Sequence, residues 1–119
     1  MIGTFDGNRN DFIALLNKNP GLIIAKFGAE WCKPCGLIKN TVDKNFDEMP
    51  DNVLCLDIDV DEAFDLFAFM KSKKMMKGIP TILCYKKGNN SFASDDSISG
   101  ADENEVQQFF DRCKKYVNI

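Results

Sequence analysis

The stretch FGAEWCKPC, residues 27–35, decides how this chain folds, because it joins two segments with different hydrophobic patterns. The run before it, residues 22–27, is almost continuously apolar, which is typical of a strand covered on both faces. The segment after it repeats apolar residues at helical spacing until a break at residues 49–52. These apolar residues are Leu37, Ile38, Val42 and Phe46. The sequence therefore predicts a buried strand, a turn carrying two cysteines, and a helix.

The two cysteines of this turn, Cys32 and Cys35, have a spacing that places both sulfurs on one side of a helix start, compatible with a disulfide. Pro34 fits the first turn of such a helix, since the amide that it lacks would be unpaired there. The first cysteine lies near the positive end of the helix, which stabilises the reactive thiolate. The second can attack the mixed disulfide that the first forms, so the pair can alternate between dithiol and disulfide without a cofactor.

Outward from this centre, the hydrophobic pattern predicts an α/β chain. We expect helices at residues 9–18, 62–76 and from Asp102 onward, and further strands at residues 53–60, 80–85 and 91–97. Strand–helix–strand order implies parallel pairing with right-handed crossovers, and the late hairpin adds antiparallel strands. The expected architecture is one domain, residues 1–119, with a mixed sheet of four to five strands and helices on both faces.

Composition excludes several classes of function. The net charge of −3 argues against unspecific nucleic-acid binding, and no apolar run reaches the roughly 20 residues of a membrane span. The absence of histidine removes histidine-based triads and histidine-ligated metals. A zinc site would need four ligands, and no second C-x-x-C pair exists. The first ten residues lack the pattern of a secretory signal, and five cysteines are an odd number, so we expect a reducing, cytoplasmic location.

The residues around the cysteine pair resemble the thioredoxin family. Residues 27–35 are similar to the active-site strand and turn of that family, and Gly78-Ile79-Pro80-Thr81 resembles its cis-proline loop. Residues 59–62 match a pattern at the end of the third strand, and residues 99–101 resemble the glycine turn before the last helix. The likeness extends over nearly the whole chain, and it implies a thioredoxin fold.

The resemblance also implies a function, the reduction of protein disulfides. Cys32 would be the attacking nucleophile and Cys35 the resolving thiol. The groove that receives the substrate would be bordered by Trp31, Lys33, Pro34, Ile79, Pro80 and Gly100. The expected partners are disulfide-containing protein substrates and an electron donor similar to thioredoxin reductase. We expect a monomer, without cofactor or metal, that binds neither nucleic acid nor membrane.

One residue departs from the family pattern. The family usually has a buried aspartate in the strand before the active site, where this chain has Lys26. Counting along the next strand gives Asp57 as its partner in a charge-swapped pair, or Cys55 if the register slips by two. We expect both members of the pair to tune thiol acidity: an ammonium favours a thiolate but cannot accept its proton. The consequence would be a more oxidising couple or a slower resolving step.

Two alternative functions remain open at this point. The first is a binding module that keeps the fold and the groove but has little redox activity, a reading that Lys26 favours. The second is a more oxidising thiol oxidase or isomerase; the dipeptide at residues 33–34 is more similar to that of reductases.

Other features have structural interpretations. Cys55, Cys84 and Cys113 are expected to be buried small hydrophobes, with Cys113 the one that is reachable if any is. In the helix at residues 62–76 the candidate core positions are Phe64, Phe67, Ala68 and Met75. Its lysines are interpreted as a solvated helix face, with a docking patch as the alternative. They are Lys71, Lys73, Lys74 and Lys77. Asn40, in place of a kinking proline, predicts a straight second helix.

Overall fold

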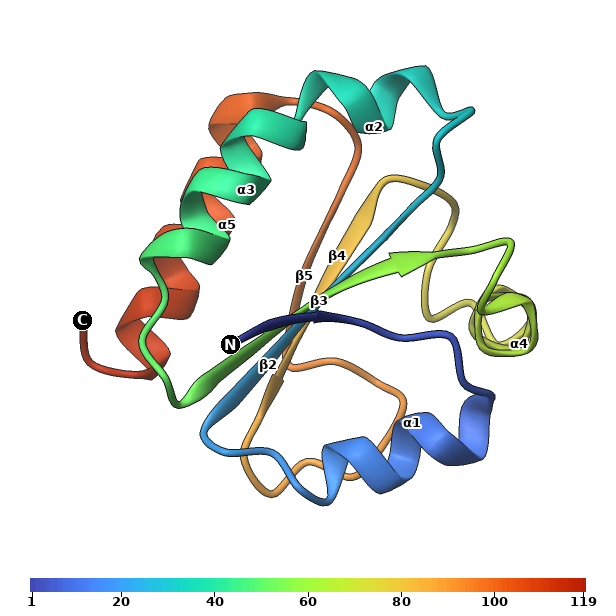
Figure 1. Ribbon diagram of the computed structural model, residues 1–119, viewed down its shortest axis with the longest axis horizontal. Helices are drawn as coiled ribbons and strands as arrows, with labels where there is room; N and C mark the ends of the chain where they lie inside the picture. Colours follow the sequence, from blue (N-terminus) through green and yellow to red (C-terminus); the bar gives the residue numbers. More distant parts are fainter.

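The computed structural model describes residues 1–119 and contains a five-stranded sheet with the strand order β1-β3-β2-β4-β5 (Figure 1). The strands are β1 (Ile2–Thr4), β2 (Leu22–Gly28), β3 (Val53–Asp59), β4 (Thr81–Lys86) and β5 (Asp96–Ser99). The helices are α1 (Arg9–Leu16), α2 (Lys33–Leu37), α3 (Lys39–Glu48), α4 (Phe64–Ser72) and α5 (Glu103–Tyr116). None of these helices combines the length and apolarity that crossing a bilayer requires.

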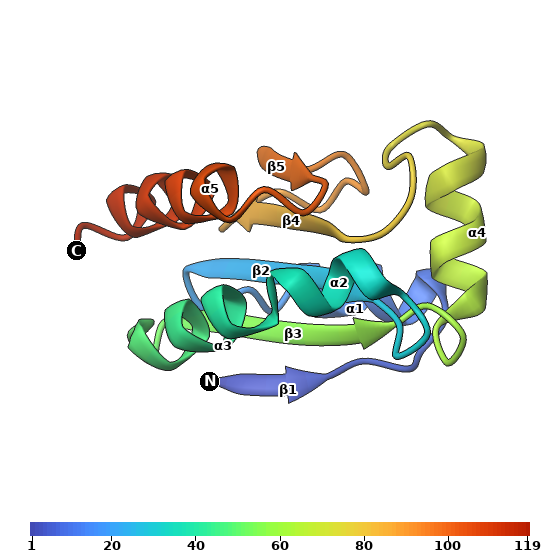
Figure 2. The same cartoon turned by 90° about the horizontal axis from the view of Figure 1, so that it is seen from above.

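The sheet is mixed, as the sequence predicts. Strands β1, β3 and β2 are parallel to one another, whereas β4 is antiparallel to both β2 and β5. Helices α3 and α5 run side by side over one face, and α1 and α4 lie on the other (Figures 1 and 2). Each face therefore has its own hydrophobic core.

The central strand β2 contributes to both cores, which explains its continuous apolar sequence. Leu22 and Ile24 pack with α3 and α5, whereas Ile23, Ala25 and Phe27 pack with α1 and α4. The strand ends at Gly28, where the chain turns toward the cysteine pair. The two cores thus fix the position from which the active turn begins.

The short strand β1 was not predicted, and the second hairpin strand begins later than predicted. β1 is only three residues long and obtains its pairing from β3, so its sequence carries no alternating pattern of its own. Residues 91–95 form an irregular loop in place of the predicted strand. The Tyr85 hydroxyl donates to the Phe92 carbonyl, and the Lys86 amide donates to the Asp95 carboxylate. These side-chain bonds replace a regular ladder until β5 starts at Asp96.

The prediction of a straight second helix was wrong. The helix is divided at Ile38, whose φ of −106° and ψ of 0° depart from helical values, into α2 and α3. Ile38 is completely buried in the core beside α5, whereas its neighbour Leu37 is exposed. The break thus coincides with the burial of the Ile38 side chain. Gly36, two residues earlier, has a low helix propensity.

The helix predicted at residues 62–76 is also shorter than expected. α4 ends at Ser72 in a Schellman motif, in which the Met75 amide donates to the Met70 carbonyl and the Lys74 amide to the Lys71 carbonyl. Lys74 adopts a φ of +58°, the left-handed conformation that ends the helix.

The core of α4 also differs from the prediction at several positions, and Ala68, predicted to be in the core, is only partly buried and lies in neither hydrophobic core. Phe64, predicted to be in the core, is 66% exposed, and Leu66 and Met70 are the fully buried residues instead. Phe67 and Met75 are partly buried against the core. The first turn was therefore predicted to face the core with the wrong side, because α4 begins only at Phe64.

Candidate active site

The site is centred on a disulfide between Cys32 and Cys35, whose Cα atoms are 5.3 Å apart. Cys32 is the N-cap of α2, and its Sγ accepts a hydrogen bond from the Cys35 amide at 3.2 Å. Pro34 lies in the first turn, as predicted, and is exposed together with Lys33. Both sulfur-bearing residues are themselves largely buried, with Cys32 7% and Cys35 4% exposed. This hydrogen bond from the Cys35 amide would stabilise the negative charge of a thiolate on Cys32.

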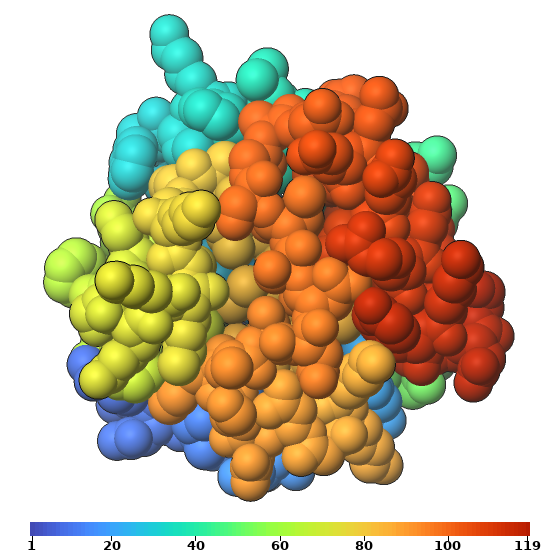
Figure 3. Space-filling view, turned by 180° about the vertical axis from the view of Figure 1, so that it is seen from behind, coloured from blue at the N-terminus to red at the C-terminus, as the bar shows by residue number.

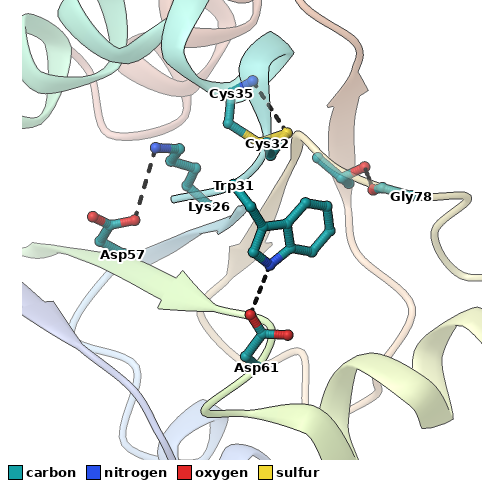
Figure 4. Close-up of a disulfide and its surroundings, with 8 residues drawn as sticks. Lys26, Trp31, Cys32, Cys35, Asp57, Asp61 and Gly78 are labelled. Atoms are coloured by element: carbon teal, nitrogen blue, oxygen red, sulfur yellow. Dashed lines mark hydrogen bonds and ion pairs between the residues drawn. A yellow bond between two sulfur atoms is a disulfide. The ribbon is translucent and has the colours of Figure 1, made fainter. Parts of the chain in front are cut away.

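The loop predicted to face the cysteines begins at Gly78, which lies to one side of the disulfide in the close-up view (Figure 4). The Ile79–Pro80 peptide bond is cis. Thr81 Oγ1 donates to the Gly78 carbonyl at 2.6 Å, which holds the loop against β4. The Gly100 amide donates to the Pro80 carbonyl at 3.0 Å. Gly100 has a φ of +100°, a conformation that favours glycine.

Trp31 forms the exposed rim of the site, with 67% of its surface accessible. Its indole N–H donates to Asp61 Oδ2 at 2.7 Å (Figure 4). Asp61 is itself held in a turn, since Asp59 Oδ1 accepts a hydrogen bond from its amide. Sequence reasoning did not assign Asp61 to the site, because the contact joins residues 30 positions apart. The bond fixes the orientation of a large exposed indole that would otherwise be free to rotate.

Lys26 and Asp57 lie opposite each other on the parallel strands β2 and β3. Lys26 Nζ is 3.8 Å from Asp57 Oδ1, and the lysine is only 8% exposed, whereas 61% of the aspartate side chain is exposed. Cys55, the alternative partner, pairs with Ile24 instead. The structure therefore contains the charge-swapped pair, and the pair lies on the side of the disulfide away from Gly78 (Figure 4).

The end of the Lys26 side chain lies near Cys35. Cys35 Sγ lies 3.4 Å, and Lys26 Cε 3.6 Å, from the position that a Cβ on Gly28 would occupy, so the two atoms are at most about 7 Å apart. Both residues line a cleft of about 520 Å³ whose wall also carries Asp57 and Asp59. The cleft next to the disulfide is thus lined mainly by polar residues.

The three other cysteines are free, and all are completely buried. Burial raises the pKa of the Cys55 thiol to about 12. A hydrogen bond with Cys84 and burial both raise the pKa of the Cys113 thiol. Cys113 is therefore not the reachable thiol that its place near the C-terminus indicated. No group of three or more cysteine or acidic side chains is arranged to hold a metal ion.

A cysteine pair that closes to a disulfide at a helix start is typical of thiol–disulfide oxidoreductases. The family model described as Thioredoxin matches residues 4–112, and the chain belongs to the thioredoxin family. Its fold is the α/β thioredoxin fold, and the chain is a protein disulfide oxidoreductase.

Relatives in several organisms support this assignment. The chain is 39% identical over 106 residues to a thioredoxin of Ictalurus punctatus, which covers 85% of this chain and 89% of that one. It is 34% identical over 112 residues to a thioredoxin of Ophiophagus hannah, covering 93% and 95%. It is 31% identical over 90 residues to thioredoxin 3 of Plasmodium falciparum (isolate 3D7), covering 76% of this chain and about half of that relative, 47%.

Solved structures agree with the fold. Trichomonas vaginalis thioredoxin superimposes with a TM-score of 0.72 at 24% identity, covering 95% of this chain and 97% of that one. Fasciola hepatica thioredoxin gives a TM-score of 0.69 at 29% identity, covering 94% and 98%.

Proposed function

We propose that this protein reduces disulfides in protein substrates through the Cys32–Cys35 couple. The Cys32 thiolate attacks one sulfur of the substrate disulfide, so that a mixed disulfide forms and one substrate thiolate leaves. Cys35 then loses its proton and attacks Cys32 Sγ, which closes the intramolecular disulfide and releases the second substrate thiol. Two electrons have moved from the cysteine pair to the substrate.

The observation that carries this proposal is the position of Cys32 Sγ, which accepts the Cys35 amide at 3.2 Å as the N-cap of α2. Gly78 lies on the side of the disulfide opposite the Lys26–Asp57 pair (Figure 4). We propose that the loop at Gly78, with Ile79, Pro80 and Gly100, forms the substrate groove. Trp31, Lys33 and Pro34 would form its opposite border.

We further propose that an electron donor similar to thioredoxin reductase returns the disulfide to the dithiol. We also propose that the protein acts as a monomer. Three free buried thiols suit a reducing compartment such as the cytoplasm.

We propose that Lys26 and Asp57 tune the acidity of the cysteine pair. Lys26 is a positioning residue that acts on Cys35 through the field of its ammonium group, which lies one bond beyond Cε. Its positive charge favours a thiolate and therefore stabilises the reduced state, which makes the disulfide more oxidising. Asp57 offsets part of this effect, because its carboxylate lies 3.8 Å from the ammonium. The pair is also the observation that favours the second candidate function, a thiol oxidant.

The test is reduction of insulin driven by dithiothreitol, measured for the native protein and for Cys32→Ser. The native protein accelerates the reaction, and the variant returns it to the rate with dithiothreitol alone. Equal rates for the two proteins would remove the proposed function and leave a binding module. The equilibrium potential against glutathione separates the reductant from the oxidant, since a potential near that of strong oxidants would favour the second candidate.

A further inference from the structure

A cluster of positive charge spans the C-terminal end of α4 and the connection from α4 to β4. Residues 71–77 contain four lysines and no acidic residue, a charge of +4, while the whole chain carries −3, so the rest of the chain carries −7. All four lysines are exposed, and none takes part in the five ion pairs of the structure. They are Lys71, Lys73, Lys74 and Lys77, here called the lysine loop.

All four lysines are solvated, as the sequence indicated, but only Lys71 lies on a helix. α4 ends at Ser72, and the left-handed conformation of Lys74 turns the chain away from the helix axis. Lys71 Nζ lies 5.4 Å from the centroid of the Phe67 ring, and Lys73 Nζ lies 6.0 Å from that of Phe69. Because rings attract cations at such distances, these two ammonium groups are held near defined positions on the surface.

The lysine loop is continuous with the loop beside the disulfide. Lys77 directly precedes Gly78, and Gly78 is fixed by the hydrogen bond from Thr81 Oγ1. In the space-filling view the segment at residues 70–80 adjoins the segment that begins α2 (Figure 3). A protein whose disulfide reaches Cys32 would therefore approach the segment that carries the lysine loop.

We propose that the lysine loop is a docking surface for acidic protein substrates, namely those with Asp- or Glu-rich sequence next to the reactive disulfide. The inference rests on the proposed function, because it concerns how the substrates of that reaction are recognised. A short acidic segment fits the size of the surface, whereas a long polyanion such as RNA would also meet the −7 charge of the rest of the chain. The charges steer association, so they act on KM and not on the exchange chemistry.

The test uses three disulfide peptides that have the same reactive centre and acidic, neutral or basic flanks. The native protein should reduce the acidic peptide with a kcat/KM about tenfold above that of the basic one at low salt, and the preference should shrink as salt is added. The variant Lys71→Gln/Lys73→Gln/Lys77→Gln should lose most of this preference through KM. Lys74 is left unchanged so that the end of α4 is preserved.

Two controls make the result decisive. The variant Lys18→Gln/Lys87→Gln/Lys115→Gln removes the same charge from exposed positions elsewhere and should keep the preference. The neutral peptide should be reduced at equal rates, within about twofold, by all three proteins, which shows that the variants are folded.

Three outcomes would overturn the proposal: no preference in the native protein, a preference that survives in the loop variant, or an equal loss in the control variant. Binding of single-stranded RNA that is tighter than binding of the acidic peptide, and lost in the loop variant, would assign the surface to nucleic acid instead. If the native protein reduced none of the peptides, the proposed function itself would fail.

Discussion

The charge at Lys26 should control the step in which Cys35 resolves the mixed disulfide. We consider the substitution Lys26→Met, which keeps the length of the side chain and removes its charge. Lys26→Arg is the matched control, because it keeps the charge. Methionine suits the buried position, and Asp57, which loses its partner, remains largely exposed to solvent.

The size of the effect follows from the geometry. Lys26 Nζ lies one bond beyond Cε, so its charge is at most about 8.5 Å from Cys35 Sγ, and two unit charges at that distance interact by about 2 kcal/mol at an effective dielectric constant of ~20. Asp57 offsets part of this attraction, since its carboxylate is 3.8 Å from Lys26 Nζ but is also largely exposed to solvent. A remaining effect of about 1.4 kcal/mol corresponds to about one pH unit, or a factor of ten in the thiolate fraction.

The assay is the reaction of the reduced protein with an aromatic disulfide that releases a coloured thiol. Attack by Cys32 releases one coloured thiol, and attack by Cys35 on the mixed disulfide releases the second, so one experiment resolves both steps. In Lys26→Met the midpoint pH of the second phase should rise by about one unit, with a smaller change in the first phase. In Lys26→Arg it should stay near the native value, and in Asp57→Asn it should fall.

The reasoning would be refuted if the second phase of Lys26→Met kept the native midpoint. It would also be refuted if Lys26→Arg shifted as far as Lys26→Met, because shape and not charge would then be responsible. A shift of Asp57→Asn in the same direction as Lys26→Met would contradict the assigned role of the aspartate.

Three further predictions concern stability and the remaining thiols. Lys74→Gly should stabilise the protein by about 1 kcal/mol in denaturant unfolding, because glycine adopts a positive φ without strain; unchanged or lower stability would count against the strained turn. Burial raises the pKa of Asp96, but hydrogen bonds from Arg112 and Tyr116 outweigh it, so the pKa is lowered. The stabilisation by the ionised Asp96 is therefore complete above the pKa of this carboxyl in the unfolded chain, and it is lost as the pH falls through its pKa in the folded protein. Arg112→Leu should lower the free energy of unfolding by about 2 kcal/mol at pH 7 and by less near pH 3. An equal loss at both pH values would contradict this prediction. Alkylation of the reduced protein at neutral pH, read by mass spectrometry, should modify Cys32 first and spare the three buried thiols until the chain is unfolded; early labelling of Cys113 would refute their burial.

The centre of the fold could be predicted from the sequence because its signals are local. The apolar run of β2 and the cysteine spacing identify the buried strand and the reactive pair without tertiary information. The pairing of Lys26 with Asp57 was also accessible, since parallel strands keep a fixed register once one position is anchored.

The features that sequence reasoning missed depend on contacts between distant residues. Lysine favours helices, so nothing local indicated that Lys74 would adopt a left-handed conformation and end α4. The bond between Trp31 and Asp61 joins two loops that only the folded sheet brings together. The short edge strand β1 likewise exists because β3 supplies its hydrogen-bond partners.

The separate roles of Cys32 and Cys35 can be tested directly by trapping the mixed disulfide with a substrate. Reduced Cys35→Ser and Cys32→Ser are each mixed with a disulfide-containing protein, and the products are analysed by mass spectrometry without reductant. Cys35→Ser should accumulate a mixed disulfide at Cys32, while Cys32→Ser should accumulate none. A covalent adduct on Cys35 in the second variant, or no adduct in the first, would contradict the assignment of Cys32 as the nucleophile.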